Sequence, residues 1–166
     1  MRILVAGIGN VLRGDDGFGI AALRRLEETQ PDSVVEFFES GTAGISLVQK
    51  LMEGWDALFL LDALDRGGAP GQVYILEPDL ISLGKSVPRQ EMIDLHQAGP
   101  EAVLRLAAAV QALPGRVWIV GCQAVGCDDL GAPLSEPVAR AVPLVVERVR
   151  GMIKGLREES GCHVGG

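Results

Sequence analysis

The chain has 166 residues, of which 48% are hydrophobic and 22% are charged, and its net charge is −7. This length suits one hydrophobic core, and this apolar content excludes an intrinsically disordered protein. The excess of acidic side chains argues against nucleic-acid and anionic-membrane partners, and no apolar run approaches the ~20 residues of a membrane span.

The first half of the chain alternates short apolar runs with helical periodicity. Residues 3–6 predict a strand. After a glycine-rich loop, Ile20, Leu23 and Leu26 lie three apart, which is the spacing of one helix face. The alternation continues with a strand at 34–38, a helix at 44–52 and a strand at 57–61. This last strand is apolar throughout, as is typical of a strand buried on both faces of a parallel sheet.

The second half begins with a strand at 73–76, which follows 57–61 after only about ten residues. That connection is too short for a parallel crossover, so we expect this strand to be antiparallel to a neighbour. A loop at 78–99 precedes a helix that starts at Pro100. A strand at 117–120 and a last helix to about residue 156 follow; Ser135 caps this helix and Pro143 kinks it.

This order of elements predicts a three-layer α/β/α sandwich with a mostly parallel five-stranded sheet and one antiparallel strand. We expect residues 1–156 to form a single α/β domain and the polar, glycine-rich residues 157–166 to form a frayed tail. In such folds the functional crevice lies outside the carboxyl ends of the strands. Chemistry is therefore expected in the loops after those ends.

The loop after the first strand carries two consecutive acids, Asp15 and Asp16. One of them can cap the following helix while the other faces the crevice as a base or a hard oxygen ligand. The loop opens like a dinucleotide fingerprint at Gly7 and Gly9, but Leu12 replaces the third glycine and the acids would repel a pyrophosphate. We therefore expect no nucleotide here.

Two further side chains join these acids as candidates. Asp62 ends an apolar strand, either as a functional carboxylate at the crevice or as a turn residue. His96 lies in the loop before Pro100, where it is either a structural histidine or a ligand. Two carboxylates and one imidazole form a plausible site for a divalent metal with open positions.

The cysteines carry less weight. Cys122, Cys127 and Cys162 are odd in number and lack C-x-x-C spacing, so neither a disulfide framework nor a zinc knuckle is expected. Cys122, at the end of the strand at 117–120, is interpreted as a small buried hydrophobe. The N-terminal segment does not fit a signal peptide, and both observations favour the reducing cytoplasm.

The ordered motifs resemble the endopeptidases that mature [NiFe] hydrogenases. The segment at 2–19 (RILVAGIGNVLRGDDGFG) resembles that family's opening, and the segments at 40–44, 62–71 and 96–99 resemble its later motifs. The resemblance implies an endopeptidase that removes the short C-terminal extension of a hydrogenase large-subunit precursor after nickel insertion. Nickel would then arrive with the substrate and act as the recognition signal.

The resemblance also implies roles for particular residues. The metal-contacting acid falls on Asp16, the second acid on Asp62 and the histidine on His96. Asp16 and Asp62 would act in catalysis, and Gly41 and Thr42 could contact the extension. Two other functions remain open at this point: a non-enzymatic nickel-binding and delivery protein, and a metal-dependent peptidase of other specificity.

Overall fold

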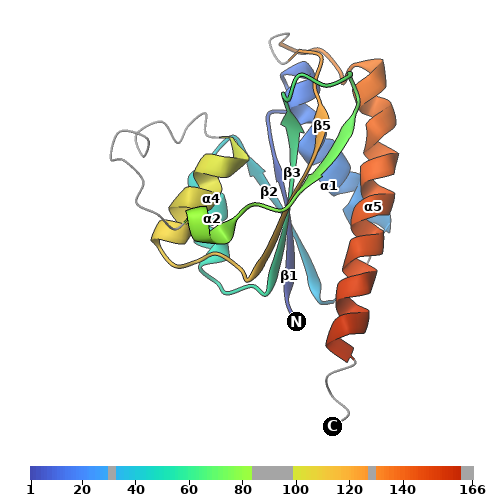
Figure 1. Cartoon of the computed structure of the whole chain (residues 1–166). Coiled ribbons are helices and arrows are strands. Elements are labelled where there is room, and N and C mark those ends of the chain that lie inside the picture. The colour runs from blue at the N-terminus through green and yellow to red at the C-terminus, as the bar shows by residue number, and fades with distance from the viewer. Residues whose placement is uncertain (30–32, 84–98, 127–129, 162–166) are drawn as a thin grey trace.

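The structure, a computed structural model, describes the whole chain except residues 30–32, 84–98, 127–129 and 162–166. It is a five-stranded sheet with helices on both faces (Figure 1). The strands are β1 (Ile3–Ile8), β2 (Val35–Gly41), β3 (Ala57–Leu64), β4 (Val73–Leu76) and β5 (Arg116–Gln123). The helical segments are η1 (Gly14–Gly17), α1 (Phe18–Thr29), α2 (Gly44–Leu51), α3 (Leu80–Leu83), α4 (Pro100–Ala109) and α5 (Glu136–Gly161).

The sheet has the strand order β2-β1-β3-β5-β4. β1 pairs in parallel with β2 and β3, and β3 pairs in parallel with β5. β4 pairs antiparallel with β5, which confirms the expectation drawn from its short connection to β3. The predicted α/β/α sandwich with a mostly parallel sheet is therefore correct, and the carboxyl ends of four parallel strands meet at one edge.

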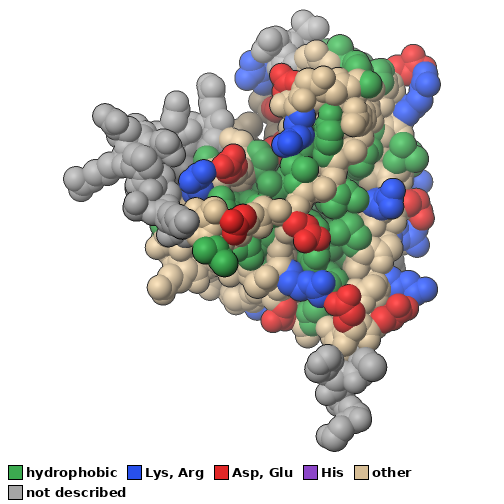
Figure 2. Space-filling model, viewed as in Figure 1, with side chains coloured by type: hydrophobic (Ala, Val, Ile, Leu, Met, Phe, Trp, Pro, Cys, Tyr) green, Lys and Arg blue, Asp and Glu red, His purple; other side chains and the backbone are tan. Residues whose placement is uncertain are grey.

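Both faces of the sheet are buried because successive strand residues point to opposite sides. In β1, Ile3 and Val5 pack with α1 and α5, while Leu4 and Ala6 pack with α2 and α4. Hydrophobic side chains are still visible over β4, between α5 and the helices α3 and α4, with charged side chains around them (Figure 2). The sheet is therefore covered less completely at its β4 edge than at its centre.

Several element bounds differ from the prediction. β2 and β5 run on past residues 38 and 120, to Gly41 and Gln123. β3 continues past Asp62 to Leu64 because this segment pairs with the end of β5. The helix α3 lies inside the expected loop at 78–99, and Asp79 accepts hydrogen bonds from the first turn of this helix. The helix α5 contains Pro143 and ends at Gly161 rather than near residue 156. The remainder of the expected tail, 162–166, lies outside the described residues.

No helix in the described part of the chain is both long enough and apolar enough to span a bilayer.

Candidate active site

The loop after β1 folds back on itself so that Asp16 faces the carboxyl edge of the sheet. Gly9 has φ +126°, and a Cβ atom there would lie 1.8 Å from the carbonyl oxygen of Asp16. Only glycine allows this contact, since a side chain would collide with backbone atoms. The backbone N–H of Asn10 donates to Oδ2 of Asp16 at 2.9 Å and holds the carboxylate in place. Gly9 thus allows the close approach of η1 to the start of the loop.

Asp62 lies inside β3 rather than at its end, which corrects the prediction. It pairs with Gly121 of β5, and only 6% of its surface is exposed. Burial, together with the negative charge of Asp16, raises the pKa of Asp62 from 3.8 to about 7. A turn-forming or solvated aspartate would show neither feature. Asp62 can therefore exchange a proton near neutral pH.

Asp16 and Asp62 line one cleft of about 570 Å³ at the carboxyl edge of the sheet. Thr42 borders the same cleft from the segment after β2, and Arg13 borders it from the loop before η1. The negative charge of Asp16 contributes to the raised pKa of Asp62, so the two carboxylates interact electrostatically. The cleft lies where the topology of a parallel sheet predicts a functional crevice.

Asp15 has a structural position. Its carboxylate is 2% exposed and accepts the backbone N–H of Ser135 at 2.7 Å, the Ser135 hydroxyl at 2.9 Å and the backbone N–H of Val125 at 2.8 Å. Burial opposes ionisation, but these hydrogen bonds outweigh it, and the pKa of Asp15 lies below 3.8. Asp15 therefore does not cap α1, as one interpretation of the sequence expected. It anchors η1 to the segment that leads into α5.

His96, the predicted third member of the site, lies outside the described residues. Gly99 and Pro100, which follow it closely in the chain, both border the cleft. In the described part of the chain, no group of three His, Cys, Asp or Glu side chains is placed to hold a metal ion. Of the three predicted ligands, Asp16 and Asp62 lie in the described part of the chain, and both line the cleft.

Gly41 and Thr42, the predicted substrate-contacting residues, take different positions. Thr42 lines the cleft, whereas the backbone carbonyl of Gly41 accepts the N–H of Gly9 at 3.1 Å. This hydrogen bond ties the end of β2 to the loop that carries Asp16. The side chain of Thr42 is thus available to a bound chain, and Gly41 supports the wall of the cleft.

Three cleft residues received no role from the sequence. Asn10 positions Asp16, while Arg13 and Asp65 line the cleft directly. Asp65 accepts a hydrogen bond from the buried amide of Gln123 at 3.0 Å. In the sequence, only the position of Asp65 three residues after Asp62 could have pointed to it. Its partner on β5, Gln123, comes next to it only when the sheet has formed. Gln123 also accepts the backbone N–H groups of Arg66 and Gly68, which fixes the loop after β3.

Cys122 is a buried thiol in the core formed with α1 and α5. Burial, with the nearby charge of Asp15, raises its pKa to about 11. A thiol in this state is a poor nucleophile near neutral pH. The interpretation of Cys122 as a small buried hydrophobe agrees with this position.

The fold and the cleft together define an α/β/α protein with two neighbouring carboxylates at the carboxyl edge of its sheet. A family model described as hydrogenase maturation protease (HycI) matches residues 20–152. The hydrogenase expression/formation protein HupD of Rhizobium leguminosarum bv. viciae is 36% identical over 150 residues, which cover 88% of this chain and 71% of that protein. HupM of Azotobacter chroococcum mcd 1 is 38% identical over 168 residues, covering 95% and 77% respectively.

Solved structures agree with these sequence relatives. The hydrogenase maturating endopeptidase HybD from E. coli has a TM-score of 0.74 and 30% identity, covering 96% of this chain and 94% of that one. The hydrogenase 2 maturation peptidase from Thaumarchaeota archaeon SCGC_AB-539-E09 has a TM-score of 0.70 and 31% identity, with coverage of 92% and 98%. This chain belongs to the hydrogenase maturation protease family. It is a peptidase by family, as its resemblance to the maturation endopeptidases implied.

Proposed function

We propose that this peptidase removes the C-terminal extension of a [NiFe] hydrogenase large-subunit precursor after nickel has been inserted. The observation that carries the proposal is the coupled carboxylate pair in the cleft. Asp62 is buried, has a pKa of about 7 and senses the charge of Asp16. Peptide hydrolysis near neutral pH needs one group that accepts a proton and one that donates it. Two carboxyl groups with different surroundings can divide these roles.

The reaction uses the pair as follows. A water molecule loses a proton to one carboxylate as its oxygen forms a bond with the scissile carbonyl carbon. The peptide C–N bond then breaks, and a carboxyl group donates a proton to the leaving amine. A proton then passes from the carboxyl group that accepted one to the carboxylate that donated one, which restores the pair for the next turnover. Asp62 suits this exchange because its pKa lies close to neutral pH.

Nickel belongs to the substrate in this proposal. The metal, held in the precursor, docks on Asp16 and Asp62 and on His96, the residue that the family resemblance assigns to it. Carboxylate and imidazole groups are suitable ligands for such a divalent ion. Docking fixes the scissile bond against the carboxylates, so part of the rate enhancement comes from positioning. Thr42, on the cleft wall, contacts the extension, and Gly41 supports that wall.

The state of the cysteine bears on the cell compartment. The described part of the chain has one cysteine, Cys122, and it is a free, buried thiol. Free thiols suit a reducing compartment, so we place the reaction in the cytoplasm.

The test is to incubate metal-free enzyme with nickel-loaded and nickel-free precursor and to measure the C-terminus of the product by mass spectrometry. We expect cleavage of the nickel-loaded precursor alone, without added metal. A nickel-delivery protein would transfer metal and leave the precursor uncut. A peptidase with its own metal would cut only after being loaded with that metal. Either result would refute the proposal.

A further inference from the structure

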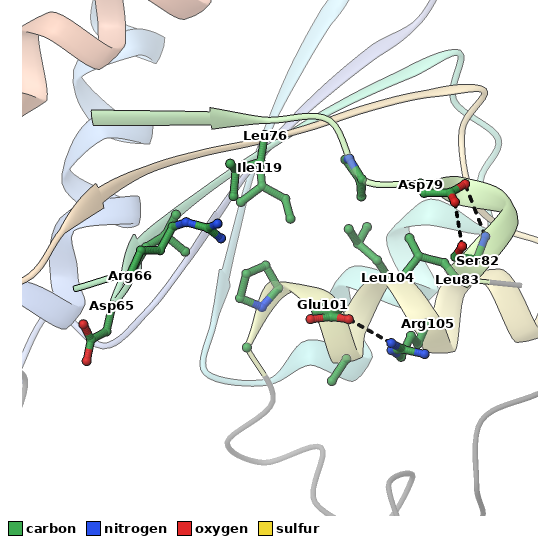
Figure 3. Close-up of a pocket in the computed structure, with 15 residues that line it drawn as sticks. Asp65, Arg66, Leu76, Asp79, Ser82, Leu83, Glu101, Leu104, Arg105 and Ile119 are labelled. Atoms are coloured by element: carbon green, nitrogen blue, oxygen red, sulfur yellow. Dashed lines mark hydrogen bonds and ion pairs between the residues drawn. The ribbon is translucent and has the colours of Figure 1, made fainter. Parts of the chain in front are cut away.

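A second, larger groove adjoins the carboxylate cleft. It has a volume of about 1020 Å³ and lies between the β4–β5 edge of the sheet and the helices α3 and α4 (Figure 3). Leu64, Asp65, Gly99 and Pro100 line both hollows. The groove and the cleft therefore border each other, and the groove lies within reach of a chain that leaves the carboxylates.

The inner wall of this groove is apolar. Leu76 and Ile119 point into it from the sheet, while Leu104 and Leu83 approach it from the helices (Figure 3). Apolar surface of this kind binds a bulky hydrophobic side chain because its transfer from water is favourable. A hollow with apolar walls and a few polar groups at its mouth is the usual form of a ligand site.

The charged side chains around the groove differ in their interaction partners. Glu101 pairs with Arg105 at 2.8 Å on α4, and Asp79 accepts the hydroxyl of Ser82 at 2.6 Å. Arg66, by contrast, pairs with no carboxylate among the residues that the structure describes. Its guanidinium lies 5.7 Å from the centre of the Tyr74 ring and reaches toward the groove (Figure 3). It can therefore pair with an anionic group of a bound chain.

We propose that this groove binds the C-terminal extension of the precursor, through a bulky apolar side chain against Leu76 and Ile119 and a carboxylate paired with Arg66. The inference rests on the proposed function and deepens it by naming where the leaving segment is held. The shared wall with the cleft selects this occupant, since the extension is attached to the scissile bond. The groove acts in binding and leaves the chemistry to Asp16 and Asp62.

Two variants test the groove without removing core residues. Arg66→Gln deletes the cation, and Ala102→Phe fills the groove from α4, where Ala102 lines it. We expect each variant to raise KM for nickel-loaded precursor about tenfold with kcat unchanged, the size of effect seen for one charge-assisted contact or one lost apolar pocket. Urea unfolding of each variant establishes that the fold is intact.

Matched controls use the same substitutions elsewhere. Arg116→Gln removes another arginine that lies over an aromatic ring, 5.2 Å from the centre of the Trp118 ring, at the start of β5. Ala109→Phe adds the same ring at an exposed position of α4 that does not line the groove. Both controls should keep the wild-type KM.

A binding assay separates this inference from the proposed function. A labelled synthetic peptide of the extension should bind wild-type protein and lose about tenfold in affinity with Arg66→Gln. Peptides with an amidated C-terminus, or with Asp and Glu replaced by amides, identify which carboxylate is involved. If wild-type enzyme cleaves the precursor while both variants keep the wild-type KM and peptide affinity, the groove proposal is wrong and the function stands.

The converse result is also distinct. If wild-type protein leaves nickel-loaded precursor uncut, the proposed function fails, whatever the peptide does. A groove occupied by a second copy of this chain would give a dimer that Ala102→Phe dissociates, with peptide affinity unchanged. Sedimentation of both proteins at several concentrations would reveal this, and it would overturn the groove proposal.

Discussion

Replacing Asp62 with asparagine should make the protein more stable at pH 8 while it abolishes cleavage. In the folded state burial and the charge of Asp16 raise the pKa of Asp62 to about 7, against 3.8 in the unfolded chain. The folded protein therefore binds more protons than the unfolded chain between these values, so its stability falls as the pH rises through this window. Asparagine keeps the size of the side chain and removes the charge.

The magnitude follows from the shift. Each unit of pKa difference is worth about 1.4 kcal/mol, so ionising Asp62 opposes folding by on the order of 4 kcal/mol above pH 7. The free energy of unfolding of Asp62→Asn, minus that of wild type, should rise by this amount between pH 4 and pH 8. Groups that titrate alike in both proteins cancel in the difference. Urea unfolding followed by circular dichroism at several pH values measures it.

Two further variants sharpen the test. Asp16→Asn removes the smaller of the two causes, so the pH dependence due to Asp62 should shrink without disappearing. Asp65→Asn should show the opposite sign and only below about pH 4, because hydrogen bonds from Gln123 and Gly67 lower the pKa of Asp65 from 3.8. A difference between Asp62→Asn and wild type that stays flat from pH 4 to pH 8 would refute the assignment of a buried, proton-binding Asp62.

The remaining predictions concern the cleft and its supports. Asp16→Asn should keep the fold and lose precursor cleavage. Asp15→Asn should lower the free energy of unfolding by about 2–4 kcal/mol, since its amide leaves buried donors without an acceptor, and the folded variant should still cleave. The reverse pattern would show that the roles of the two acids are exchanged. His96→Ala should lose part of the preference for nickel-loaded over nickel-free precursor in a titration, since Asp16 and Asp62 remain; an unchanged preference would exclude His96 as a ligand. Gly19→Ala should cost about 3 kcal/mol or more, because its Cβ would lie 2.3 Å from two backbone carbonyl oxygens, while Gly155→Ala in open space on α5 should stabilise by about 0.5–1 kcal/mol. Equal unfolding midpoints for these two glycine variants would contradict the packing described.

The architecture could be predicted from the sequence because its signals are local. Apolar runs fix the strands, and the short connection before Val73 fixes the one antiparallel pair. The exact ends of strands could not be predicted. Asp62 remains in β3 because Gly121 pairs with it, and that pairing is decided by two segments distant in sequence. A polar residue after an apolar run therefore looked like a strand end.

The candidate site shows the same division. The sequence motifs singled out Asp16 and Asp62 as candidate site residues, and both line one cleft. The raised pKa of Asp62 depends on its burial among strands, which composition does not report. The structural role of Asp15 was hidden as well, since its partners Val125 and Ser135 lie in the last third of the chain. The groove at Arg66 exists only once β4, β5 and α4 are assembled.

The anchor between Asp15 and Ser135 joins residues separated by 120 positions in the chain. During synthesis the N-terminal motif leaves the ribosome long before its anchor does. Until Ser135 emerges, the carboxylate of Asp15 lacks two of its hydrogen bonds, and η1, which also carries Asp16, lacks its anchor to the segment before α5. Chains that stop short of Ser135 should therefore carry Asp16 and Asp62 and yet lack this anchor of the cleft. Under the proposed function, the cleft would become fully supported only after the last third of the chain has been made.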